Sequence, residues 1–555
     1  MPAGSCATVS CMKWLFGRRY VLYAVTIFLS AFLLFLIQPL IGRVLLPWFG
    51  GASSVWATGL LFFTAMLFLG YAYAYSLSRR AFATQARIHL WVIGIGCATV
   101  LAYLFVFNSV FPPLDWTIGS ALSPSLLVLL SLLIMIGIPY FLLATTGPLL
   151  QYWFAIKEAR EPYQFYILSN LGSFIALGTY PFVIEPLFRL STQRGIWTAL
   201  FILFAVLYGV LAYHFLRAAR SREFSSHENT RDDGVISYTK RIQWMLYATL
   251  PAMLMAATTT ELTQTIAPVP FLWVLPLGLY LLTFIVAFRG WGGGGLDAVI
   301  ILTLAGMVFW IAGYQYEAVT RQMFLYLAFF FAVGVYCHAQ LYASRPSAPH
   351  SALFYLFISL GGVVGTLIVS IVAPLVFNDW LEFPLGIMAA ALSAVILFPA
   401  MRYVRDEYTR PVVVMRAIVL FVVAAVGMYN VRTLNNFYFY VTRNFYGVVK
   451  IYEGEGERKL YSGTTLHGKQ FTDPELAIRP STYYGAGSGA GRAIAYESLL
   501  QKGKKNTGLN VGVIGLGTGS IAAYCSSTDR FVFYEIDARL EDIAREYFTY
   551  LPNCA

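Results

Sequence analysis

The stretch that decides the fold of the C-terminal part is Asn510-VGVIGLGTGSIAAYCSSTDRFVFYEI-Asp537. Residues 511–514 form an apolar run typical of a buried parallel strand, and a second apolar strand, Phe531–Tyr534, ends on Glu535. The glycine-rich turn between them is expected to open a helix and to let a ligand approach the backbone. An acid about 20 residues further on can accept both hydroxyls of a ribose. This order predicts a nucleoside-binding Rossmann half, and a structural βαβ unit without a ligand is the alternative.

Most of the remaining chain is predicted to lie in a membrane. Of its 555 residues, 58% are hydrophobic and 12% are charged, which excludes an ordinary soluble globular protein. Apolar spans of about 20 residues can cross a hydrocarbon core of about 30 Å. The first span is long and lacks a small-residue cleavage site, so we interpret it as a retained helix. We predict about 13 spans, near 21–40, 55–76, 88–108, 125–146, 164–184, 196–216, 243–264, 269–288, 297–313, 323–342, 352–376, 384–401 and 411–430.

The net charge of +11 is distributed as membrane topology requires, and it does not indicate nucleic-acid binding. With the N-terminus inside, the inner segments hold 19 Lys and Arg residues and the outer loops between spans hold 4. This predicts an integral protein of the inner or plasma membrane with a cytoplasmic N-terminus. An odd number of crossings then places the tail outside, where adenosyl cofactors are not expected, so the side of the tail stays open.

The cysteines do not form a recognisable pattern. Without a CxxC pair or a metal-ligand spacing, they predict neither a disulfide framework nor a zinc site. They are Cys6, Cys11, Cys97, Cys337, Cys525 and Cys554. The sequence also lacks a Walker loop, an HExxH motif and a nucleophile elbow.

Two stretches of the membrane region resemble each other, namely Phe165-YILSNLGSFIALGTYPFVIEPL-Phe188 and Phe354-YLFISLGGVVGTLIVSIVAPLV-Phe377. Each would be the fifth span of a six-span half, with a break at the polar linker. Two such halves are typical of a parallel transporter repeat. Convergent small-residue packing between membrane helices is the alternative.

These observations predict a polytopic α-helical membrane protein of about 12–13 spans, followed by a β-hairpin region and a partial Rossmann domain. Strand-like segments at 436–443, 445–453 and 459–470 surround a glycine turn, which predicts the hairpin. The predicted divisions are a cytoplasmic N-terminus 1–20, a first half 21–216, a linker 217–242, a second half 243–402, a last span 411–430, a β-hairpin region 432–505 and a partial Rossmann domain 506–555.

The chain resembles the fused membrane and spermidine-synthase family, whose membrane part is major-facilitator-like, over nearly its whole length. The tail is similar to spermidine synthases, in which a β-hairpin domain precedes a methyltransferase-like domain. Besides the glycine turn followed by Tyr-Glu-Ile-Asp, the motifs that carry the resemblance are Phe35-LIQPLIGRVLLPWFG-Gly51, Tyr140-FLLATTGPLLQYW-Phe154, Phe271-LWVLPLGLYLLTFIVA-Phe288, Phe445-YGVVKIY-Glu453 and Tyr461-SGTTLHGK-Gln470.

The resemblance implies a membrane-anchored aminopropyl transferase that uses decarboxylated S-adenosylmethionine or S-adenosylmethionine and a small-molecule amine. The implied donor-binding residues are Gly515, Gly517, Thr518, Gly519 and Glu535. The implied substrate-pocket residues are Gln470, Tyr483 and Tyr484.

Two departures favour a second interpretation, a transporter or membrane sensor with a vestigial or regulatory tail. Thr518 stands where the family has an Asp that meets the donor's ammonium group. The family's catalytic Asp follows a fourth strand, and the given sequence reaches only the second, so no catalytic residue is predicted. The sequence is therefore either a fragment or an incomplete catalytic domain.

Four ionisable residues complete the candidates. His467 is either a base of the substrate pocket or a hairpin histidine bonded to backbone. Glu185, Glu261 and His338 fall near the ends of predicted spans, where they either line a pathway or lie at the membrane interface. The predicted partners are the lipid bilayer and a small molecule.

Overall fold

The computed structural model describes two compact units. It covers residues 18–158, 163–220, 236–265, 270–290, 319–347, 350–397, 437–463, 465–504 and 508–553, with the isolated positions 418, 421 and 425. The helical unit comprises Met1–Ala373 and Leu381–Ala424, and the tail unit comprises Pro374–Trp380 and Ala425–Ala555.

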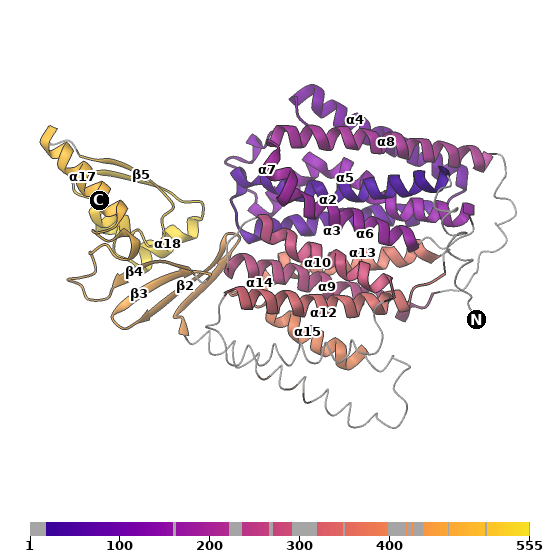
Figure 1. Cartoon of the computed structure of the whole chain (residues 1–555). Helices are drawn as coiled ribbons and strands as arrows, with labels where there is room; N and C mark the ends of the chain where they lie inside the picture. Colours follow the sequence, from indigo (N-terminus) through magenta and orange to yellow (C-terminus); the bar gives the residue numbers. More distant parts are fainter. Residues whose placement is uncertain are drawn as a thin grey trace. The chain divides into compact units, whose positions relative to one another are not determined.

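The helical unit is a bundle of long apolar helices that run roughly side by side (Figure 1). Among the described residues, eight helices are long and apolar enough to cross a membrane, so the chain is an integral membrane protein. The predicted spans 297–313 and 411–430 lie outside the described residues. The main helices are α2 (Arg18–Phe49), α3 (Ser53–Ser78), α4 (Phe82–Phe107), α5 (Pro124–Glu158), α6 (Tyr163–Thr179), α8 (Leu190–Arg220), α9 (Tyr238–Thr265), α10 (Pro270–Phe288), α12 (Val319–Ala343), α13 (Ser351–Leu367) and α15 (Glu382–Leu397).

The two stretches with similar sequences have the same irregular helical form. In each, a 17-residue α-helix passes into a 5-residue π-helical segment and then into a short α-helix. Such π-helical turns are rare and mark functional positions in many helices. The successive segments are α6, η2 (Tyr180–Ile184) and α7 (Glu185–Leu187) in one stretch, and α13, η5 (Ile368–Val372) and α14 (Ala373–Val376) in the other.

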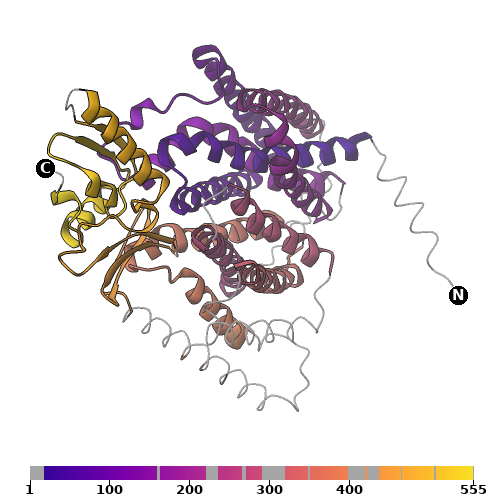
Figure 2. The same ribbon diagram turned by 60° about the vertical axis from the view of Figure 1, so that its left-hand side comes forward.

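Helix packing follows the same correspondence. Helix α2 packs on α6 as α9 packs on α13, and α3 packs on α5 as α10 packs on α12. The helices from α2 to α8 form one group and those from α9 to α15 form the other. Between these two groups, α3 packs on α13 and α10 packs on α6. Figure 2 shows the earlier helices, in indigo to purple, and the later helices, in magenta to orange, as two groups.

Helices α9 and α13 approach closely because glycines line their contact. A Cβ atom placed on Gly365 would lie 2.5 Å from the carbonyl oxygen of Thr249 and 2.7 Å from the backbone nitrogen of Met253. Gly361 has the same close approach to Met245 and Ala248 one turn earlier. Small residues let membrane helices gain van der Waals contact that lipid alone does not provide.

In the tail unit, the predicted hairpin is a four-stranded antiparallel sheet with strand order β1-β2-β3-β4. The expected strand at 459–470 is two strands, because the chain turns at Gly463 with a φ of 60°. The first turn, at Glu455 and Gly456, also has positive φ values. The strands are β1 (Tyr440–Asn444), β2 (Gly447–Gly454), β3 (Glu457–Ser462) and β4 (Thr465–Phe471).

The glycine stretch forms a parallel pair of strands, as predicted, but the helix between them is short. Strands β5 (Asn510–Ile514) and β6 (Arg530–Tyr534) pair in parallel. The turn leads into the 3-10 helix η9 (Ser520–Tyr524), so the prediction of a regular helix here is wrong. Longer helices are α17 (Gly489–Lys504) and α18 (Ala538–Tyr547), and the core of this unit contains Val449, Ile451, Leu460, Ala522, Ile543, Phe548 and Tyr550.

Two polar contacts hold Asp379 in the tail unit. Lys450 pairs with Asp379 at 2.6 Å with both side chains largely buried, and Arg443 donates to the Asp379 carbonyl oxygen at 3.1 Å.

Cys525 is disulfide-bonded, and its partner lies outside the described residues. The prediction that the cysteines form no disulfide is therefore wrong for Cys525, because sequence spacing does not reveal pairs that folding brings together.

Candidate functional site

The helical unit encloses a cavity of about 150 Å³ between the two groups of helices. Helices α2, α3, α5 and α6 line it from one group, and α9, α10 and α13 from the other. Among the described residues, no charged side chain lines it. Its polar lining consists of amide and hydroxyl groups, among them Gln38, Thr64, Gln151, Asn170 and Ser359.

Gln38 presents an acceptor without a protein partner to this cavity. Its Nε2 donates to the Leu34 carbonyl oxygen at 3.5 Å and to Tyr140 Oη at 3.3 Å. Because a carbonyl oxygen can only accept, Leu34 fixes the orientation of the amide. Gln38 Oε1 is buried and has no hydrogen-bond partner among the described residues, an arrangement that is costly unless a ligand or water completes it.

Gln151 also lines the cavity with an amide group. Tyr355 Oη lies 3.0 Å from Gln151 Oε1, and the pair is buried. Because a hydroxyl group can donate or accept, this contact does not set which end of the Gln151 amide faces the cavity.

Hydroxyl contacts join the two groups of helices beside the cavity. Thr64 Oγ1 of α3 and Thr366 Oγ1 of α13 lie 2.8 Å apart. In the π-helical segment η5, Ser370 Oγ donates to the Ala57 carbonyl oxygen of α3 at 2.7 Å. These bonds are few and neutral, so they can be exchanged if the groups move relative to one another.

The three ionisable candidates of the membrane region have protein partners and do not line the cavity. Glu185 pairs with Arg43 at 3.5 Å, and Glu261 accepts from Tyr326 Oη at 3.4 Å. His338 is fully buried, with its Nδ1 2.8 Å from Thr283 Oγ1. We therefore do not place them in the site.

In the tail unit, the three glycines of the turn all have left-handed backbone angles. The φ values are 88° at Gly515, 58° at Gly517 and 77° at Gly519, which other residues rarely adopt. A Cβ at Gly515 would meet open space. A Cβ at Gly517 would lie 3.1 Å from the His467 carbonyl oxygen, and one at Gly519 would lie 3.0 Å from Leu551. Gly515 is thus the glycine that faces free space.

Glu535 is held in place at the end of β6 by backbone amides. Its Oε2 accepts from Leu516 N at 2.8 Å and its Oε1 accepts from Asp537 N at 3.0 Å. A carboxylate oxygen has two lone pairs, so each oxygen can accept one further hydrogen bond. The glycine turn and the acid are therefore joined directly.

Strand β4 crosses this turn. His467 lies near Glu535, whose charge partly offsets the effect of burial, and burial lowers the pKa of His467. Thr518 is buried against Gly468 and lies 2.7 Å from Ser520 Oγ through its hydroxyl group. Thr518 therefore faces the interior, and we do not retain it as a ligand residue.

The three predicted substrate-pocket residues are not gathered around one opening. Gln470 is buried, and its amide bonds to Ala477 and to Thr549, so it is structural. Tyr483 Oη donates to the His467 carbonyl oxygen at 3.0 Å, and burial raises the pKa of Tyr483 to about 12. Tyr484 packs on Tyr483 with ring centroids 4.5 Å apart. Tyr483 alone of the three lies beside His467.

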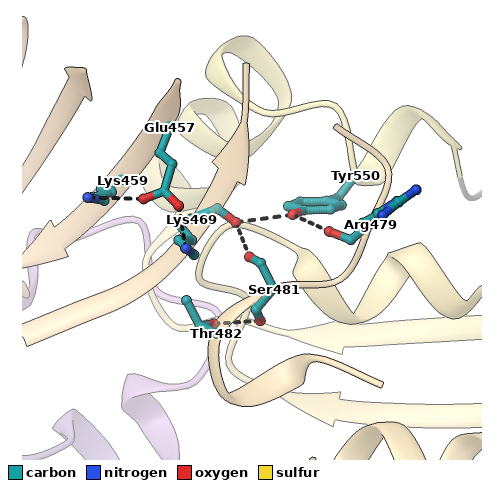
Figure 3. Close-up of polar contacts among 7 residues, drawn as sticks. All are labelled: Glu457, Lys459, Lys469, Arg479, Ser481, Thr482 and Tyr550. Atoms are coloured by element: carbon teal, nitrogen blue, oxygen red, sulfur yellow. Dashed lines mark hydrogen bonds and ion pairs between the residues drawn. The ribbon is translucent and has the colours of Figure 1, made fainter. Parts of the chain in front are cut away.

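A cluster of polar side chains, which includes Glu457, Lys469 and Ser481, holds β4 in place (Figure 3). Lys469 and Lys459 both contact Glu457, and their hydrogen bonds hold the pKa of this carboxyl below its usual range. The Lys469 carbonyl oxygen accepts from Ser481 Oγ and, at 3.1 Å, from Tyr550 Oη. These contacts fix β4 against the loop that holds Ser481.

Comparisons with known proteins add little. No family model matches the chain, and no curated protein matches it. Among solved structures, the chain is similar to a mutant of the nucleoside transporter NupG, with 12% identity, a TM-score of 0.38, and coverage of 74% of this chain and 100% of that one. A similarity this weak carries no inference about function.

The sequence analysis missed Gln38, Tyr140 and Gln151. Gln38 and Gln151 each interrupt an apolar run that we quoted only for its family resemblance. Polar groups inside predicted membrane spans are costly and mark functional positions, which was the available signal.

Proposed function

We propose that the chain is a membrane transporter for a small uncharged solute, with the cavity as its solute site. The cavity carries the proposal, because both groups of helices line it and no charged side chain of the described residues does. The corresponding irregular stretches α6–η2–α7 and α13–η5–α14 support two equivalent halves. Transporters built from repeats place the solute site between the repeats near the middle of the membrane. We expect a cysteine placed in the cavity to react with an impermeant reagent from either face.

The tail carries a second candidate function, which is the binding of an adenosyl nucleoside. The direct bond between the glycine turn and Glu535 favours this function. Aminopropyl transfer from an S-adenosylmethionine-type donor would need more, namely a group for the donor's ammonium and a catalytic base. Thr518 is buried, so it supplies neither.

Glu535→Gln is expected to weaken methylthioadenosine binding to the full chain by about 1–3 kcal/mol, because a charged acceptor becomes neutral. Asp529→Asn is the matched control. Asp529 also accepts from two backbone amides, Leu509 N and Ser526 N, but lies at the opposite end of β6. Calorimetry should show unchanged affinity for this control. Equal binding of methylthioadenosine by wild type and Glu535→Gln would show that Glu535 is not part of a nucleoside site.

We also propose that the N-terminus is cytoplasmic and that the tail lies on the opposite face. Asp379 follows the helix that ends at Val376, and it pairs with Lys450. Because the two residues are in contact, they lie on the same face of the membrane. The segment between them must then cross the membrane an even number of times, and α15 and the predicted span 411–430 provide two crossings. The disulfide at Cys525 supports an oxidising compartment. This placement disfavours a donor that is made in the cytoplasm.

Reporter fusions test this orientation. A reporter at Arg220, the end of α8, is expected to give a cytoplasmic signal, and a reporter at Gly491 an extracytoplasmic one. The measurement is paired phosphatase and fluorescence activity in whole cells. A cytoplasmic signal from both fusions would show that the tail is on the inner face.

A further inference from the structure

We infer that the cavity recognises a planar, uncharged solute that carries an N–H group, as a cyclic amide or imide does. This inference rests on the proposed function in one respect, since it takes the cavity to be the solute site. It adds the chemical class of the solute and the residue that selects it, Gln38.

The acceptor for the solute's N–H group is Gln38 Oε1. This side chain is 3% exposed and lines the cavity, and its Nε2 is held by Leu34 and Tyr140. A buried carbonyl oxygen without a partner selects a ligand that donates, because an apolar ligand would leave the oxygen unpaired.

A second amide, Gln151, lines the same cavity and is 2% exposed. Tyr355 Oη contacts this amide at 3.0 Å. Because a hydroxyl group can donate or accept, this contact does not set which end of the amide faces the cavity. The class of the solute therefore follows from Gln38 Oε1.

The volume of the cavity, its lack of charged lining among the described residues and its aromatic walls restrict the class of solute further. A cavity of about 150 Å³ is comparable to one that holds a benzene ring. An ionised solute would be buried here without a counter-charge, which is strongly unfavourable. The walls include the rings of Phe63, Tyr166, Tyr280 and Phe284, and flat aromatic surfaces favour a planar ring.

Binding of radiolabelled uracil to the purified full chain tests this inference, with two matched analogues as competitors. 1,3-Dimethyluracil keeps the ring and both carbonyl groups but has no N–H, and orotate adds a carboxylate to the ring. We expect uracil to bind, and both analogues to compete at least tenfold more weakly. Gln38→Leu should weaken uracil binding at least tenfold and should not weaken the binding of 1,3-dimethyluracil, which then no longer leaves a buried oxygen unpaired.

Gln264→Leu is the matched control, because Gln264 bonds to Ser53 Oγ and does not line the cavity. Gln38→Met, which keeps the length of the side chain, provides the second reading if Gln38→Leu does not fold. Absence of uracil binding, equal competition by 1,3-dimethyluracil, or unchanged affinity in both cavity variants would overturn the inference. If uracil binds as expected but a cavity cysteine reacts from one face only, the transport proposal fails and this inference stands.

Discussion

Gly365→Ile is expected to prevent the helical unit from folding stably, at a cost of about 3 kcal/mol or more. Any Cβ at this position would lie 2.5 Å from the Thr249 carbonyl oxygen and 2.7 Å from Met253 N, which are backbone atoms that cannot rotate away. Helices α9 and α13 would have to separate. Size-exclusion chromatography and thermal unfolding in detergent should show aggregation or a markedly lower melting temperature.

Gly362→Ile provides the matched control. Gly362 lies on the same helix, three positions away, and a Cβ there would meet nothing within 4 Å. The control should remain monodisperse, although it narrows the cavity. Equal stability of the two variants would show that α9 and α13 are not in close contact.

Removing one partner of the Asp379–Lys450 pair is expected to destabilise the tail unit by about 3–5 kcal/mol. The side chains are 14% and 11% exposed, so Asp379→Ala leaves the ammonium group buried without its partner. Replacing both residues by apolar ones should restore much of the loss, because no charge is then left unpaired. Thermal unfolding of the four proteins of this double-mutant cycle measures the coupling.

The exposed pair Glu541–Arg545 is the control for this prediction. Its side chains are more than half exposed, so Glu541→Ala should cost less than about 1 kcal/mol. A similarly small loss for Asp379→Ala would mean that the loop at 377–380 is not bound by the tail unit.

The membrane part of the fold could be predicted because apolar length alone defines a span. The predicted 352–376, for example, coincides closely with α13 and its extensions η5 and α14. The cavity could not be predicted in the same way. Gln38 and Gln151 are far apart in the sequence, and only the packing of α2 and α5 shows that both line one cavity and that Gln38 Oε1 has no partner among the described residues.

In the tail, local sequence predicted β5, β6 and the position of Glu535, because glycine spacing and strand patterns are local properties. It did not predict that η9 would be short. It also did not show which polar residues are buried. The family resemblance implies Gln470 and Thr518 as ligand residues, whereas tertiary contacts with Thr549 and Gly468 turn both toward the protein interior.

The central claim, that the cavity is a solute site open to each face in turn, is tested most directly by the reactivity of Ser359→Cys. Ser359 lines the cavity. A membrane-impermeant maleimide is applied to right-side-out and inside-out vesicles, and the reaction of the unaltered chain is subtracted. Ser131→Cys, buried on α5 away from the lining, is the control. The account predicts labelling of Ser359→Cys from both faces and of Ser131→Cys from neither, whereas labelling of Ser359→Cys from one face only, or from neither, would contradict it.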